Sequence, residues 1–209
     1  MKHVWLKQSE GASHVLVVFG GWAIGAEVFS SLQSHDDILF ISEYRDLDYA
    51  LPDLSHYHHR ILVAWSFGIA SYCHWQAKNK DVFERKIAIN GSMIPIDREK
   101  GIPPQAMQKT IDTLSNASFQ IFLTRAHNAK VAEIKIDVGA REAELIAVLE
   151  RGAAPAQQWD RIWLSQKDRI FPPANMERAW AQQAHAVKRI DEPHVPFHHW
   201  QNWDEVIDA

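Results

Sequence analysis

The stretch Ile61-Leu62-Val63-Ala64-Trp65-Ser66-Phe67-Gly68-Ile69-Ala70 decides the fold of this chain. Its first four residues are apolar, which indicates a buried strand, and an alanine-rich helical pattern follows Gly68. Ser66 therefore stands at a strand-to-helix turn. A serine at such a turn is typical of a nucleophile elbow, in which a strained backbone presents the hydroxyl at the top of a sheet. The motif has the form G-x-S-x-G, except that Ala64 replaces the first glycine.

Composition narrows the class of protein. A length of 209 residues, with 46% hydrophobic and 23% charged residues, is typical of one globular domain. The net charge of −4 and the lack of a basic stripe argue against a nucleic-acid partner. The single cysteine, Cys73, excludes an internal disulfide, agrees with a reducing compartment and is interpreted as a small buried hydrophobe.

The apolar run from Val15 to Ala26 resembles a signal peptide only superficially. Polar residues separate it from Lys2 and Lys7, and Gly20-Gly21 interrupts it. A core strand followed by a glycine loop explains the run better. With no run long enough to span a bilayer, we expect a cytoplasmic protein without membrane contact.

Strand-like runs alternate with helical patterns along most of the chain. The runs are His14–Phe19, Asp37–Ile41, Arg60–Ala64, Lys86–Asn90, Arg161–Ser165 and Ala186–Ile190, with His3–Leu6 as a further edge strand. The helical patterns between them are Gly25–Leu32, Phe67–Lys78 and Pro172–Ala184. This alternation predicts an α/β fold with a mostly parallel, doubly wound sheet.

Residues 92–155 interrupt this alternation. Prolines break the chain early in the segment, and amphipathic helical patterns then cover Pro104–Leu114 and Ala140–Arg151. Ser115-Asn116 can cap another helix between them. We therefore expect residues 1–209 to form one domain, in which residues 92–155 form a helical lid inserted before the last two strands.

An oxyanion hole is predicted where the first buried strand ends. His14–Phe19 leads into Gly20-Gly21-Trp22, and glycines let a loop approach a substrate closely. The backbone N–H groups of Trp22 and Phe67 are the candidate donors. Each such donor typically contributes ~3 kcal/mol of transition-state stabilisation. A phosphate loop is disfavoured because no lysine and Ser/Thr pair follows.

The remaining catalytic candidates also follow strands. Asp168 comes after Arg161–Ser165 and suits the acid of a triad, although Asp97 is an alternative. His194 lies nearest the end of the last strand, with His198 and His199 as rivals for the base. The order Ser, Asp, His along the chain is that of α/β-hydrolases.

A metal site is not expected. His56, His58 and His59 lie close together, but no cysteine or glutamate pattern accompanies them. We expect no metal and no other cofactor.

These residues resemble those of a known family. Nearly the whole chain is similar to the BioG type of pimeloyl-acyl-carrier-protein methyl ester esterase, a small α/β-hydrolase of biotin biosynthesis. The resemblance rests on Phe19-Gly20-Gly21-Trp22, Ala64-Trp65-Ser66-Phe67-Gly68, the turn at Asp168 and His194-Val195-Pro196-Phe197. It implies a serine esterase that converts the carrier-linked methyl ester to pimeloyl-carrier protein and methanol. Ser66, His194 and Asp168 would then act through an acyl-enzyme.

The resemblance also implies a channel and a partner. Phe119, Phe122 and Leu123 are the expected lining for the acyl chain. Carrier proteins of this kind are acidic, so Arg125 and Lys130 are expected to contact the carrier. Other basic residues are available in the same region, namely Arg98, Lys100, Lys109 and Lys135. Two alternatives remain open, a general carboxylesterase or thioesterase and a non-catalytic binding protein on a hydrolase scaffold.

Overall fold

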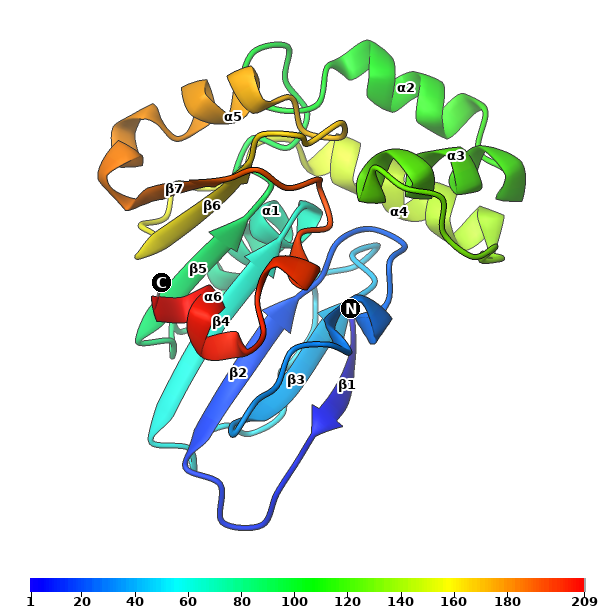
Figure 1. The fold of residues 1–209 in the computed structure, drawn as a ribbon. Coiled ribbons are helices and arrows are strands. Elements are labelled where there is room, and N and C mark those ends of the chain that lie inside the picture. Colours follow the sequence, from blue (N-terminus) through cyan, green and yellow to red (C-terminus); the bar gives the residue numbers. More distant parts are fainter. Residues whose placement is uncertain (209) are drawn as a thin grey trace.

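The computed structural model describes residues 1–208 and contains a seven-stranded sheet. The strands are β1 (Lys2–Lys7), β2 (His14–Phe19), β3 (Asp37–Ser42), β4 (His59–Trp65), β5 (Arg85–Ile89), β6 (Arg161–Ser165) and β7 (Val187–Ile190). Their order in the sheet is β1-β3-β2-β4-β5-β6-β7. β1 is antiparallel to β3, and every other neighbouring pair is parallel. The predicted α/β fold with a mostly parallel sheet is confirmed (Figure 1).

Helices connect most of these strands. They are α1 (Phe67–Gln76), α2 (Pro104–Asp112), α3 (Asn116–His127), α4 (Val138–Arg151), α5 (Pro173–Ala179) and α6 (Trp203–Asp208), with 3-10 helices η1 (Ala26–Phe29), η2 (Ala181–Ala186) and η3 (Phe197–His199). No helix within residues 1–208 is long and apolar enough to cross a membrane.

Two predicted helices differ from the structure by more than two residues at one end. The pattern Gly25–Leu32 forms only η1, because the adjacent serines Ser30 and Ser31 favour turns over helix. The pattern Pro172–Ala184 is split into α5 and η2, and Gln183 within η2 has a non-helical φ of −120°. Neither change moves the strand ends that carry the candidate site.

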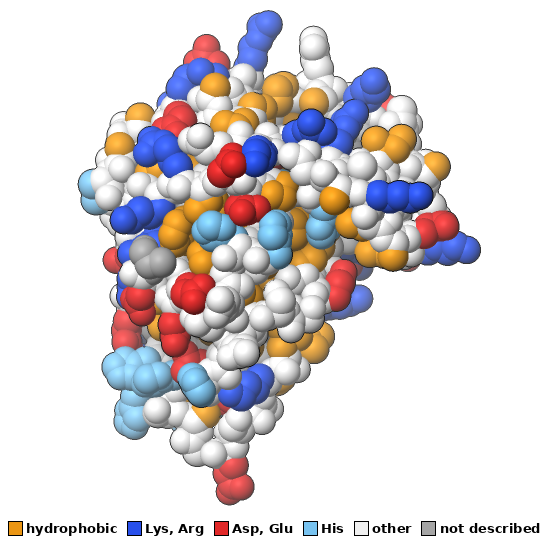
Figure 2. All heavy atoms as spheres, viewed as in Figure 1, with side chains coloured by type: hydrophobic (Ala, Val, Ile, Leu, Met, Phe, Trp, Pro, Cys, Tyr) orange, Lys and Arg blue, Asp and Glu red, His pale blue; other side chains and the backbone are white. Residues whose placement is uncertain are grey.

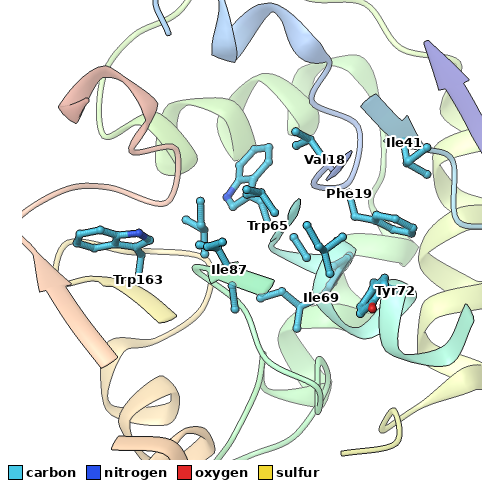
Figure 3. Packing of buried hydrophobic residues seen from close by; sticks show 14 of the residues in the cluster. Val18, Phe19, Ile41, Trp65, Ile69, Tyr72, Ile87 and Trp163 are labelled. Carbon is cyan, nitrogen blue, oxygen red and sulfur yellow. The ribbon is translucent and has the colours of Figure 1, made fainter. Parts of the chain in front are cut away.

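The core occupies both faces of the sheet. Successive residues of a strand point to opposite faces, so Val18 and Phe19 reach different layers (Figure 3). Phe19 packs against Tyr72 of α1, with ring centroids 5.3 Å apart. Trp65 packs on the other face against Phe197, at 5.2 Å. Burial on both faces explains why β2 and β4 read as continuous apolar runs.

Helices α2, α3 and α4 lie above the carboxyl ends of the central strands (Figure 1). Each buries one apolar stripe at helical spacing, as with Met107 and Ile111 of α2 or Phe119 and Leu123 of α3. Ser115 caps α3 by accepting from the backbone N–H of Ser118. These helices therefore cover the edge of the sheet where Ser66 stands.

Candidate active site

Ser66 occupies a strained turn between β4 and α1. Its φ of 59° and ψ of −127° lie where residues with a side chain are rare. Helix α1 passes so close to β2 that a Cβ on Gly68 would lie 2.2 Å from the carbonyl oxygen of Phe19. Position 68 therefore requires glycine, as the sequence motif indicated.

A second glycine behind the turn was not singled out from the sequence. A Cβ on Gly91, just after β5, would lie 2.5 Å from the carbonyl oxygen of Ser66. The available sequence signal was its place directly after the predicted strand Lys86–Asn90. Ala64, in contrast, pairs with Ala88 of β5 and is fully buried, so a methyl group fits there.

Ser66, His194 and Asp168 form a continuous hydrogen-bonded line. His194 Nε2 lies 3.0 Å from Ser66 Oγ, and His194 Nδ1 lies 2.7 Å from Asp168 Oδ2. The other carboxylate oxygen of Asp168 accepts from the backbone N–H groups of Ile170 at 2.7 Å and Phe171 at 2.9 Å. All three side chains are buried, and His194 is only 1% exposed. The arrangement can move a proton from the serine hydroxyl to an oriented imidazole.

The rival residues have other partners. Asp97 accepts from the backbone N–H groups of Glu99 and Lys100, which hold the pKa of its carboxyl below the ordinary value. His198 and His199 both pair with Glu192. Asp168 and His194 are thus the candidates that the fold brings to Ser66.

Residues that sequence reasoning missed hold the His194 backbone. The carbonyl oxygen of His194 accepts from Trp65 Nε1 and from Asn90 Nδ2, each at 3.0 Å. Asn90 Oδ1 also accepts from the backbone N–H of Ser165 at 2.8 Å. The ring of Phe171 stacks on the imidazole at 5.9 Å. The available signal for Asn90 was its place at the end of the predicted strand Lys86–Asn90.

The two residues whose backbone N–H groups are the candidate oxyanion donors lie at the same cavity as Ser66. Trp22 and Phe67 both line it. Within residues 1–208, neither backbone N–H donates to a protein acceptor. For Phe67 this follows from its place as the first residue of a helix, where N–H groups lack partners. Both N–H groups are therefore free of protein acceptors in the described residues.

The cavity has a volume of about 370 Å³ and combines apolar walls with basic residues. Its apolar walls include Met107, Phe119 and Phe122, whereas Lys109, Arg125 and Arg169 supply positive charge. No acidic residue is found among its lining residues in the described part of the chain.

The structure agrees only in part with the residues expected to line the acyl channel and to contact the carrier. Phe119 and Phe122 line the cavity, but Leu123 does not, because successive side chains of a helix point about 100° apart and that of Leu123 packs in the core. The expectation for Leu123 is therefore corrected. Arg125 lines the cavity, whereas Lys130 is exposed outside the lining.

Other reactive groups lie elsewhere. Cys73 is buried in α1, and burial raises the pKa of its thiol to about 12, so it stays protonated. Within residues 1–208, no group of three or more His, Cys, Asp or Glu side chains is arranged to hold a metal ion.

The fold and the serine turn define the class of protein, an α/β-hydrolase. The enol-lactonase of Burkholderia xenovorans LB400 shares this fold, with a TM-score of 0.63 and 12% identity over 93% of this chain and 89% of that one. The chain belongs to the family described as pimeloyl-ACP methyl esterase BioG, whose family model matches residues 1–206. BioG from Haemophilus influenzae has a TM-score of 0.88 and 26% identity over the whole of both chains.

One curated relative is much longer than this chain. The malonyl-[acyl-carrier protein] O-methyltransferase of Bacteroides fragilis (strain 638R) is 29% identical over 197 residues, which are 86% of this chain and 39% of the relative. The chain thus spans about two fifths of that relative's length.

Proposed function

We propose that this protein is a serine esterase that hydrolyses the methyl ester of pimeloyl-[acyl-carrier protein] methyl ester, a step of biotin biosynthesis. The observation that carries the proposal is the hydrogen-bonded line Ser66–His194–Asp168, which ends in a cavity lined by apolar and basic residues. Its family and its fold support an ester hydrolase.

The geometry suits an acyl-enzyme mechanism. His194 Nε2 accepts the proton of Ser66 Oγ as this oxygen bonds to the ester carbonyl carbon. The backbone N–H groups of Trp22 and Phe67 stabilise the resulting oxyanion. His194 then donates its proton to the departing methoxide, which leaves as methanol. Asp168 holds the imidazole in the required tautomer and stabilises its charged form.

Water completes the reaction by the same groups. His194 accepts a proton from water as the water oxygen bonds to the acyl carbon. The second tetrahedral adduct collapses, Ser66 recovers its proton from His194, and the free carboxylate of the acyl chain leaves.

The cavity supports a long acyl substrate that carries negative charge. The walls formed by Met107, Phe119 and Phe122 suit a methylene chain. Lys109, Arg125 and Arg169 favour an anion, and no acidic residue among the described lining opposes them. Basic side chains also gather on the visible face of the helices above the sheet (Figure 2). We propose that Arg125 at the cavity and the exposed Lys130 contact an acidic carrier protein.

The methyltransferase relative supports the methyl ester as substrate. Its name describes methyl transfer to an acyl group on a carrier protein, and part of its length is similar to this chain. A methyl ester on a carrier-linked acid is the product of such a transfer. An esterase that removes the methyl group would act on the same type of ester.

Hydrolysis assays test this proposal. Methyl pimeloyl-carrier protein and free monomethyl pimelate are each incubated with the purified protein, and loss of the methyl group is followed by mass spectrometry. We expect faster turnover of the carrier-linked ester and, in Ser66→Ala, a loss on the order of 10⁴–10⁶ in turnover. Unchanged turnover in Ser66→Ala would refute the nucleophile, and equal rates for the two esters would refute recognition of the carrier.

A further inference from the structure

The loop that carries the Trp22 N–H is intrinsically pliable. Gly20 and Gly21 precede Trp22, and peptide planes between glycines rotate at little cost. One orientation is nevertheless selected, since the carbonyl oxygen of Gly20 accepts a hydrogen bond from Tyr44 Oη at 2.9 Å. The Gly20 N–H donates to the carbonyl of Ile41 at 2.9 Å.

Tyr44 is suited to hold this carbonyl. The residue is completely buried, and its ring lies parallel to that of Phe19 with centroids 6.3 Å apart. Its hydroxyl proton is shared with the carbonyl of Ile41 at 3.1 Å. Burial, and then the negative charge of Glu144, raise the pKa of Tyr44 well above its ordinary value. Tyr44 therefore keeps its proton and remains a donor.

Helix α4 holds Tyr44 in turn. Glu144 Oε1 accepts from the backbone N–H of Tyr44 at 2.9 Å, and Arg151 Nη2 donates to the Tyr44 carbonyl at 2.6 Å. Glu144 is 1% exposed and pairs with Arg141 at 2.8 Å. The carbonyl of Arg141 accepts from Trp22 Nε1 at 3.0 Å. Helix α4 thus contacts the loop directly through Trp22 and indirectly through Tyr44.

We propose that Tyr44 and Glu144 are positioning residues that fix the loop Gly20-Gly21-Trp22 so that the Trp22 N–H points at the developing oxyanion. This inference rests on the proposed function. Neither residue lines the cavity, so both act through the loop and not on the substrate. Helix α4 therefore helps to form the oxyanion hole as well as covering the sheet.

Removal of one hydroxyl tests the role of Tyr44. In Tyr44→Phe the ring stays and the hydrogen bond to Gly20 is lost. We expect kcat for p-nitrophenyl butyrate to fall about tenfold with KM nearly unchanged, less than the 10²–10³-fold loss typical when a donor is removed outright. Inhibition by an alkyl boronic acid, which forms a tetrahedral adduct on Ser66, should weaken by a similar factor.

The matched control is Tyr72→Phe. Tyr72 is also fully buried against Phe19, but its hydroxyl bonds to Asp81 and not to the loop. We expect its kcat to stay at the wild-type level. An unchanged kcat in Tyr44→Phe, or an equal loss in both variants, would overturn the positioning role.

A second pair of variants covers the case in which Tyr44→Phe fails to fold. Glu144→Gln keeps an acceptor for the Tyr44 N–H, whereas Glu144→Met removes it. We expect kcat to be retained in the first and reduced about tenfold in the second, within the effects known for oxyanion donors. Equal values of kcat would refute the inference. Activity that survives Ser66→Ala would instead refute the proposed function itself.

Discussion

At the scale of single residues, the backbone of Ser66 is held by close packing. Neighbouring backbone lies close to the turn on two sides. A Cβ on Gly68 would meet the Phe19 carbonyl, and a Cβ on Gly91 would meet the Ser66 carbonyl. A positive φ at serine costs on the order of 1–3 kcal/mol and persists only when its surroundings impose it. The conformation of Ser66 therefore depends on Gly68 and Gly91, which have no reactive side chain.

This packing makes Gly91→Ala a sharp test. A Cβ there would lie 2.5 Å from the Ser66 carbonyl oxygen, so the elbow has to shift. We expect esterase turnover to fall by about 10²-fold, because misplacement by about 1 Å has that effect on catalysis. The control is Gly139→Ala, where a Cβ on α4 would meet nothing closer than 3.8 Å. Wild-type turnover in Gly91→Ala would contradict the prediction.

The acid of the proposed triad is tested by a pair of isosteric changes. Asp168→Asn presents the wrong hydrogen-bonding group to His194 Nδ1 and should lower kcat by on the order of 10⁴. Asp97→Asn alters only a turn formed with Glu99 and Lys100 and should leave kcat unchanged. The measurement is steady-state hydrolysis of the same ester by both variants. The reverse order of effects would make Asp97 the acid.

At the scale of elements, helix α3 both lines the cavity and supports the histidine loop. Phe122 faces the cavity, whereas Leu123 is packed in the core. The backbone N–H of Val195 donates to the carbonyl of Ala126 at 3.0 Å, which joins the end of α3 to the residue after His194. A helix of the predicted lid is thus part of the framework of the site.

Two neighbouring substitutions separate these roles of α3. Phe122→Ala opens the cavity wall and should raise KM for long acyl esters with little loss of stability. Leu123→Ala leaves a core cavity and should cost ~2–5 kcal/mol of unfolding free energy. Denaturant unfolding and chain-length profiles measure the two effects. Equal destabilisation by both changes would show that Phe122 is a core residue instead.

At the scale of the whole molecule, charge is unevenly distributed. The chain has a net charge of −4, yet the described cavity lining carries basic residues and no acidic ones. An acidic carrier would be repelled by the molecule as a whole and attracted at this opening. Such an arrangement orients the carrier as it approaches and raises the rate of association.

Salt dependence tests this attraction. We expect kcat/KM for the carrier-linked ester to fall as salt rises, while that for free monomethyl pimelate changes little. Reversal of two charges in Lys109→Glu with Arg125→Glu should lower the first value about tenfold at low salt. Lys188→Glu on the edge strand β7 is the control, because Lys188 is exposed but outside the cavity. If Lys188→Glu lowered kcat/KM equally, the effect would come from net charge and not from the charges at the cavity.

Much of the architecture was predictable because its signals are local. Continuous apolar runs identified the central strands, and the run before Ser66 located the elbow to the residue. Helix ends were less predictable, since Gly25–Leu32 became a short 3-10 turn. The sequence showed only that Gly91 follows a predicted strand, and not what it packs against, because the atom that it must avoid belongs to Ser66 in the turn after another strand.

The sequence by itself determined the succession of strands and helices along the chain. It also determined the candidates for nucleophile, base and acid. Only the tertiary structure decided which candidates meet, since His194 and Asp168 contact each other while His198, His199 and Asp97 have other partners. It also brought Glu144 to Tyr44, 100 positions apart in the chain. The physical reason is that periodicity and turn chemistry act between near neighbours, whereas loop convergence depends on how the whole sheet and its covering helices pack.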